Sequence, residues 1–313
     1  MSRKPSQTMK AQTHRVMSKV FTTQSRHELK NEMGLKGAQS TGRIHSIGTL
    51  NAYKNALVQV AEYAKSEFGV QKIKDIQPEH VESYLKEKAA NGYHQTTLTN
   101  ARNAANLALT HLHKAEVNIE KFEGLERSKD PRSYSQDQID RVAERQNERN
   151  ALATHIAHDA GLRAHELLTL HRVDEGHPSS HREWRDDRFE GREGQVYLVT
   201  GKGGLTREVL IRDGLAEKLE ARRLPEPEVI RDRGIKYEPK YDISGGHKWS
   251  NSFSRSSQTE MGRSSGAHGL RHSYAQERME ELQQKGYRFN DARLVVSQEL
   301  GDFRGSITNT YLR

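Results

Sequence analysis

The chain has 313 residues, of which 33% are hydrophobic and 29% charged, which is enough for two domains of ordinary size. It contains no apolar run near the roughly eighteen residues that span a bilayer and no segment resembling a signal peptide, so we expect no membrane association and a cytoplasmic location. Cys is absent, which excludes a disulfide framework and a cysteine metal cluster.

The net charge of +8 is distributed unevenly along the chain. Residues 1–45 hold nine Lys and Arg against two Glu, a net charge of +7, and have little apolar periodicity. Residues 1–47 are therefore predicted to form a basic arm that is disordered or marginally helical by itself. Such an arm favours nucleic acid as a partner, with a merely solvated tail as the alternative.

Three amphipathic helices are predicted for residues 48–121. The first begins behind Thr49, which can cap its first turn, and the second begins at Pro78 and ends before Asn91. The third carries Leu98 and Leu112 on its apolar face. The segment is thus expected to be a small helical domain whose polar faces suit either DNA or solvent.

Residues 122–134 are polar, contain a Pro and are predicted to be a linker to a second domain over residues 135–313. In that domain Ser135 and Gln138 have capping-box spacing, and VYLVTGKGGLTREVLI has the pattern of a β-hairpin. The charged stretch from Asp174 to Gln195 is expected to be a loop insertion. Together these features predict a mainly α, α+β fold with a small antiparallel sheet.

Two short motifs carry candidate functional residues. Arg163 and Glu166 in GLRAHEL are three apart and are expected to share a helix face, and Lys202 lies in the Gly turn of the hairpin. Taken singly, Arg163 and Lys202 are each better explained as an ordinary surface cation.

A third motif, AHGLRHSYAQ, places His268 and Arg271 at the start of a helix. The apolar stripe of this helix already occupies the inward face, so the two are expected to point to polar surroundings. His272 is expected to be packed or to support the site rather than to react.

The last segment is predicted to be a helix capped by Asn290 and ended by Gly301, with Tyr311 on a following turn. Two Arg, one Lys, one His and one Tyr without an acidic metal cluster suit a phosphodiester. Guanidinium groups hold phosphate oxygens, a phenol can attack phosphorus, and Lys or His can protonate a leaving oxygen.

The order and context of these residues resemble the tyrosine recombinase (phage integrase) family. The matching positions are Arg163 in GLRAHEL, Lys202 in the hairpin, His268 and Arg271 in HGLRHS, and Tyr311 eleven residues after the Leu of LGD. The resemblance covers about Ser135 to Arg313, and the helical domain before it resembles the SAM-like core-binding domain of that family.

The resemblance implies a site-specific recombinase of a phage or mobile element that grips double-stranded DNA and assembles as a tetramer on it. Accessory DNA-bending or directionality factors are further expected partners, and no metal or cofactor is required. Tyr311 would form a 3′-phosphotyrosine and free a 5′-hydroxyl. The resemblance assigns phosphate binding to Arg163 and Arg271, acid catalysis to Lys202, assistance in proton transfer to His268 and support of the first Arg to Glu166.

Two departures from the family pattern keep other interpretations open. Asp302 stands where the family usually has His or Trp, so it must be protonated, turn toward a cation such as Arg304, or lower the rate. Many relatives also continue beyond the tyrosine into a tail that docks on a neighbour. The alternatives are an enzyme that nicks and closes one DNA strand, as type IB topoisomerases do, and a weakened relative that only binds DNA as a regulator.

Overall fold

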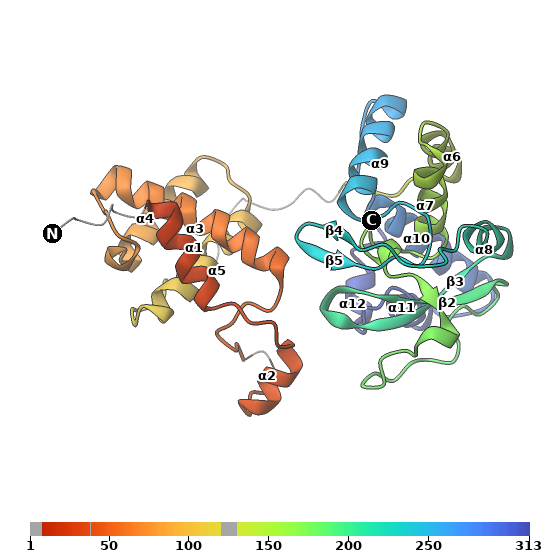
Figure 1. Ribbon diagram of the computed structural model, residues 1–313, viewed down its shortest axis with the longest axis horizontal. Helices are drawn as coiled ribbons and strands as arrows, with labels where there is room; N and C mark the ends of the chain where they lie inside the picture. Colours follow the sequence, from red (N-terminus) through yellow and green to blue (C-terminus); the bar gives the residue numbers. More distant parts are fainter. Residues whose placement is uncertain (1–7, 38, 120–129) are drawn as a thin grey trace. The chain divides into compact units, whose positions relative to one another are not determined.

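The computed structural model describes residues 8–37, 39–119 and 130–313. The chain divides into two compact units, Met1–Ser128 and Lys129–Arg313, which are treated separately below (Figure 1). No helix among the described residues has both the length and the apolar character needed to cross a membrane. Most of the predicted linker, residues 122–129, lies outside the described ranges.

The described part of the first unit is built from helices. They are α1 (Met9–Lys19), α2 (Arg26–Glu32), α3 (Ile47–Phe68), the 3-10 turn η1 (Ile73–Asp75), α4 (Pro78–Ala90) and α5 (Gln95–His111). The predicted start at Pro78 is confirmed. The predicted cap at Thr49 is wrong, because the hydroxyl of Ser46 accepts the Thr49 N–H at 3.1 Å and α3 begins earlier.

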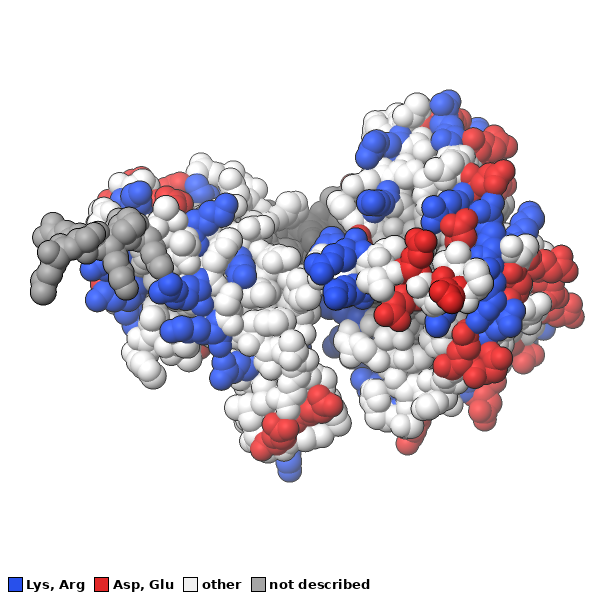
Figure 2. Space-filling view, viewed as in Figure 1, with Lys and Arg blue, Asp and Glu red and all other residues white. Residues whose placement is uncertain are grey.

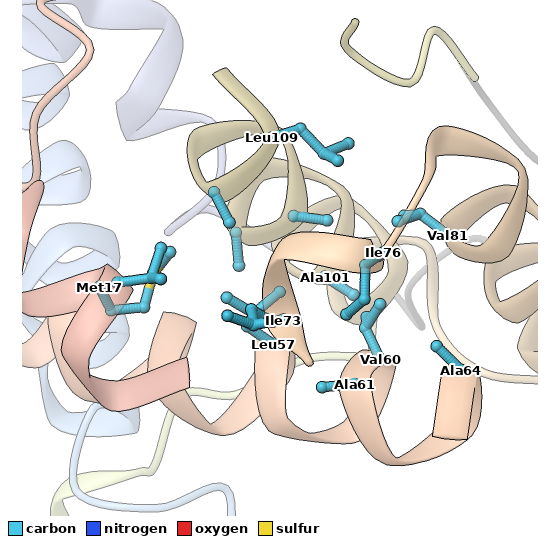
Figure 3. Packing of buried hydrophobic residues seen from close by; sticks show 14 of the residues in the cluster. Met17, Leu57, Val60, Ala61, Ala64, Ile73, Ile76, Val81, Ala101 and Leu109 are labelled. Atoms are coloured by element: carbon cyan, nitrogen blue, oxygen red, sulfur yellow. The ribbon is translucent and has the colours of Figure 1, made fainter. Parts of the chain in front are cut away.

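Helix α1 belongs to the core of the first unit, whereas the sequence analysis expected residues 1–47 to be an arm that is disordered or marginally helical by itself. Met9, Val16, Met17 and Val20 are buried and join the apolar cluster formed by α3, α4 and α5 (Figure 3 shows Met17 with its neighbours in this cluster). The physical reason is a helical repeat of these side chains, which gives α1 one apolar face despite its many polar residues. The basic segment therefore contains two helices, α1 and α2, of which α1 contributes buried side chains to the core.

The second unit combines helices with two small antiparallel sheets. Its helices are α6 (Gln136–Glu144), α7 (Glu148–Asp159), α8 (Asp213–Glu220), α9 (Gly246–Met261), α10 (Gly269–Gln284), α11 (Phe289–Glu299) and α12 (Gly305–Thr308), with 3-10 turns η2 (Glu166–Leu168), η3 (Val173–Glu175) and η4 (Lys202–Gly204). Its strands are β1 (His171–Arg172), β2 (Gln195–Thr200), β3 (Thr206–Ile211), β4 (Ile230–Asp232) and β5 (Ile235–Tyr237).

The strands form two hairpins. One sheet has the order β1-β2-β3, and the predicted hairpin is β2–β3, closed by Thr200 opposite Thr206. The other is β4–β5, whose turn residues Arg233 and Gly234 both have positive φ, as a two-residue hairpin turn requires. In Figure 2, Lys and Arg side chains lie around β4–β5, whereas Asp and Glu side chains lie mixed with Lys and Arg on the α8 side of this unit.

Two neighbouring boundaries differ from their prediction. Tyr134, assigned to the linker, is buried in the second unit, where it accepts the Ser265 N–H at 2.8 Å and exchanges two hydrogen bonds with Ser273. Helix α11 is capped at Arg288 and not at Asn290. The capping box of Ser135 and the α+β fold class are confirmed.

Candidate active site

Arg163 lies in a turn that follows α7. Gly161, with φ +60°, makes this turn, and a Cβ there would come within 2.7 Å of the Tyr274 ring and 2.9 Å of Leu300, so only Gly fits. Because α7 has already ended, Arg163 and Glu166 do not share a helix face, and that prediction is wrong. They are nevertheless in contact, since Arg163 donates to the Glu166 carboxylate from its backbone N–H at 2.8 Å and from Nη1 at 2.9 Å.

Glu166 is fully buried and is surrounded by three guanidinium groups. Beyond Arg163, Arg207 Nη2 lies 3.1 Å from Oε2 and Arg271 Nη1 lies 4.0 Å from the same oxygen. Burial by itself raises the pKa of this carboxyl, but Arg207, Arg271 and Arg163 outweigh it and hold the pKa far below its ordinary value. Glu166 is thus a permanent anion that compensates a buried cationic cluster.

Arg207 was missed by the sequence analysis. It lies on β3 with Val209 and Ile211 on the same face of the strand, and its side chain is only 1% exposed. Its Nε donates to the Glu299 carbonyl oxygen at 2.9 Å. The sequence did contain a signal for its burial. Side chains alternate between the two faces of a strand, so Arg207 is expected on the same inward face as Val209 and Ile211.

Arg271, on the first turn of α10, is also fully buried. Its guanidinium donates to the carbonyl oxygens of Gly161 and Leu300, and its Nε donates to the Tyr311 hydroxyl at 3.2 Å. Arg271 does point to polar surroundings, as expected, but it lies in the core while His268 is exposed. Backbone carbonyls replace water as its partners.

Tyr311 follows α12 and packs in an apolar cluster of the second unit, with 6% of its surface exposed. Its ring centroid is 5.1 Å from that of His272 and 5.8 Å from that of His268, and the Arg271 guanidinium carbon lies 5.4 Å above it. The phenol is therefore anchored by packing while its hydroxyl is held by one of the candidate phosphate-binding arginines.

Both histidines beside Tyr311 are neutral at neutral pH. Burial, followed by the charges of Arg132 and Arg313, lowers the pKa of His272 to about 4. Desolvation, followed by the charge of Arg271, also lowers the pKa of His268. His268 is exposed to solvent, so water screens part of this effect and the ring is accessible to a ligand.

Asp302 contacts the two candidate phosphate-binding arginines directly. Its Oδ2 lies 3.4 Å from Arg163 Nη2 and 3.5 Å from Arg271 Nη2. Arg304, suggested as its cationic partner, is exposed and forms no ion pair with it. The carboxylate therefore lies against the arginine pair and not against Arg304.

Lys202 is exposed at the tip of the β2–β3 turn. The neighbouring Gly201 lies against the other site residues, since a Cβ there would be 2.9 Å from Glu166 Oε1 and 3.9 Å from Arg163 Nη1. The base of the turn is thus part of the site, whereas the exposed Lys202 side chain forms no hydrogen bond or ion pair with the described residues. Those residues also include no group of three or more His, Cys, Asp or Glu placed to hold a metal ion.

Known proteins share sequence and structural features with this chain. A family model described as phage integrase, N-terminal SAM-like domain, matches residues 40–109 in the first unit, and no curated protein matches the sequence. The structure of XerH site-specific recombinase bound to its palindromic difH substrate aligns with a TM-score of 0.58 at 17% identity, covering 97% of this chain and 90% of that one. The chain has the fold of a tyrosine recombinase.

Two further recombinase structures align over most of this chain. The Tn1549 transposon integrase in complex with a circular intermediate DNA has a TM-score of 0.52 at 11% identity, covering 96% of this chain and 95% of that one. The lambda integrase tetramer bound to a Holliday junction has a TM-score of 0.50 at 14% identity, covering 91% of this chain and 75% of that one. The resemblance predicted from the sequence is confirmed for the recombinase fold.

Proposed function

We propose that the chain is a site-specific DNA recombinase that cuts and rejoins strands through a 3′-phosphotyrosine intermediate. The observation that carries the proposal is the hydrogen bond between Arg271 Nε and the Tyr311 hydroxyl, in a cluster that also contains Arg163. A phenol and two guanidinium groups held together supply a nucleophile and a clamp for the phosphate that it attacks. The recombinase fold supports the same conclusion.

In the proposed reaction, the Tyr311 oxygen attacks the scissile phosphorus and the bond from phosphorus to the 5′ oxygen breaks. Arg163 and Arg271 bind the non-bridging oxygens and stabilise the charge that develops on them. Lys202 donates a proton to the departing 5′ oxygen, and His268 assists the transfer of the proton that the Tyr311 hydroxyl gives up as it bonds to phosphorus. The 5′-hydroxyl of the partner strand then attacks the phosphotyrosine and restores the tyrosine.

Glu166 and Arg207 act through the phosphate-binding arginines. Glu166 compensates Arg163 and Arg271 at the same time, and Arg207 holds Glu166 from the side of β3. Their proposed role is to keep the guanidinium groups in a fixed geometry before DNA arrives, so that little reorganisation is needed on binding.

The proposed partner is double-stranded DNA, with the helical first unit and the catalytic second unit both contacting it. Figure 2 shows Lys and Arg spread over the visible face of the first unit, which suits a phosphate backbone. We extend the tetramer described for lambda integrase to this chain as part of the proposal, together with accessory DNA-bending or directionality factors. The expected location is the cytoplasm, where the DNA is.

One observation favours a second candidate function. Because Asp302 occupies the arginine pair, the chain could be a weakened relative that binds DNA as a regulator without cutting it. Covalent attachment to DNA separates the two functions, since only the recombinase forms it. An enzyme that only nicks and closes one strand would attach but would not exchange strands between two sites.

The test uses a nicked suicide substrate made from the DNA that flanks the gene. The parent protein is expected to form an adduct that maps to Tyr311, and Tyr311→Phe is expected to bind the same DNA without forming it. Tyr287→Phe, a tyrosine on the second unit outside the site, is the control and should react like the parent. An adduct in Tyr311→Phe, or none in any protein that binds the site, would overturn the proposal.

A further inference from the structure

The loop between η3 and β2, residues 176–194, packs against the end of α11. The backbone N–H of Arg185 donates to the side-chain oxygen of Gln298 at 2.7 Å, and the Gln298 amide donates back to a loop carbonyl at 3.2 Å. The Phe189 N–H donates to the buried Glu299 carboxylate at 2.8 Å. This segment, called the insertion loop below, is therefore tied to the residues that immediately precede the Gly301 turn.

An aromatic contact extends the same attachment beyond the turn. The Trp184 ring lies 4.9 Å from the Phe303 ring in an edge-on arrangement, and the Arg182 guanidinium lies 4.8 Å above Phe303. Trp184 is itself held, since its indole N–H donates to the Ser179 carbonyl at 3.2 Å and Arg188 lies 4.8 Å above its ring. The insertion loop thus grips the segment on both sides of Asp302.

The opposite side of this segment faces the active site. The Leu300 carbonyl oxygen accepts a hydrogen bond from Arg271, and Asp302 Oδ2 lies within 3.5 Å of both Arg163 and Arg271. Only 26% of the Asp302 side chain is exposed, so much of the carboxylate is shielded from water where it meets the arginines. A single carboxylate oxygen therefore stands between the two groups that we assign to phosphate binding.

We propose that Asp302 is an internal anion that competes with the scissile phosphate for Arg163 and Arg271, and that the insertion loop holds it there through Trp184. The proposal rests on the proposed function only in assigning phosphate binding to the two arginines. Before DNA arrives, the carboxylate compensates part of the positive charge of the pair, together with Glu166, and contacts both guanidinium groups. When a phosphate enters, the two anions cannot share the arginines, and the carboxylate must move away.

The first test measures the binding of inorganic phosphate to the DNA-free full-length protein, by phosphorus NMR or calorimetry at neutral pH. Asp302→Asn keeps the size of the side chain but removes its charge, and it should bind phosphate at least about tenfold more tightly, the effect of removing one like charge at this range. Asp186→Asn, an exposed position in the insertion loop, is the matched control and should bind like the parent. Equal affinity in the parent and Asp302→Asn would overturn the proposal.

The second test asks whether Trp184 acts through Asp302. Trp184→Ala should tighten phosphate binding by about threefold in the parent and should have no effect in the Asp302→Asn background, because the group that Trp184 positions is then uncharged. Trp184→Phe retains an aromatic contact with Phe303 and should restore the parent affinity. An equal change in both backgrounds would show that Trp184 is merely structural and would overturn the role of the insertion loop.

The two proposals fail in different ways. If Asp302→Asn binds phosphate more tightly but no adduct forms on Tyr311 in any variant, the competition by Asp302 stands and the recombinase function fails. If the adduct forms but phosphate affinity does not depend on residue 302, the function stands and the competition fails. Circular dichroism of each variant shows whether a change in affinity comes from loss of folded protein.

Discussion

Replacing Glu166 by Gln keeps the size of this side chain but removes the fully buried carboxylate that lies within 4.0 Å of all three guanidinium groups. Arg207 and Arg271 are 1% and 0% exposed, so Arg207 would lose its ion-pair partner without gaining water, and Arg271 would keep only Asp302. Breaking a buried ion pair by removing one partner costs about 3–5 kcal/mol. For a unit of this size, where 1 kcal/mol shifts Tm by about 2–4 °C, we expect Tm to fall by about 6–20 °C.

Thermal and urea unfolding of the full chain, followed by circular dichroism, would measure this loss. Asp137→Asn breaks the exposed pair between Asp137 and Arg141, whose side chains are 74% and 48% exposed, and should cost less than about 1 kcal/mol. A loss in Glu166→Gln no larger than in this control would refute the idea that the carboxylate compensates the cluster.

The difference in unfolding free energy between the parent and Glu166→Gln should also depend on pH. Because the arginines hold the pKa of Glu166 below its ordinary value of 4.5, the stability that it contributes is complete above that pH and declines as the pH falls further. The difference in unfolding free energy between the parent and Glu166→Gln should therefore stay constant from pH 7 to about 5 and become smaller below about pH 4.5. A difference that stays constant below pH 4.5 would mean that this carboxyl has its ordinary pKa, and a difference that widens as the pH falls would mean that its pKa is raised.

Three further predictions concern other parts of the chain. Lys202→Ala should slow cleavage of a normal suicide substrate but be rescued when sulfur replaces the 5′ leaving oxygen, and equal defects on both substrates would exclude Lys202 as the acid. The pKa of His272 is about 4 in the folded state against 6.5 in the unfolded state. The parent should therefore lose roughly 2–3 kcal/mol of unfolding free energy between pH 6.5 and 4.5, and His272→Asn should not. Urea unfolding of both proteins at the two pH values would show this. Replacing Lys10, Arg15 and Lys19 by Gln should lower the slope of log K against log salt by up to about 2.7 for duplex DNA, and an unchanged slope would show that α1 does not contact phosphate.

Elements with local signals were predictable from the sequence. Pro78 begins α4 because its fixed φ suits a first helical turn, and Ser135 and Gln138 form the predicted capping box. The β2–β3 hairpin follows from β-rich runs around paired glycines. The candidate site residues were found by their order along the chain, and the structure brings Arg163, Arg271 and Tyr311 together.

The features that sequence reasoning missed depend on contacts between distant segments. Arg207 looks like an ordinary charged residue until Glu166, 41 residues earlier, supplies its buried partner. The insertion loop has no period of its own, and its order comes from α11 and Phe303, more than a hundred residues later. Asp302 was flagged as unusual, but its partners could be identified only once the turn at Gly301 placed it against both arginines.

The burial of α1 changes the entropy of any DNA contact that this segment makes. A disordered basic arm must be fixed in one conformation when it binds, at a cost of about 1–2 kcal/mol for each residue that becomes ordered. In this chain Met9, Val16, Met17 and Val20 have already fixed the helix during folding, so Lys10, Arg15 and Lys19 are carried on a formed backbone. The conformational entropy is lost on folding rather than on binding, and each phosphate contact can contribute more of its favourable free energy to affinity.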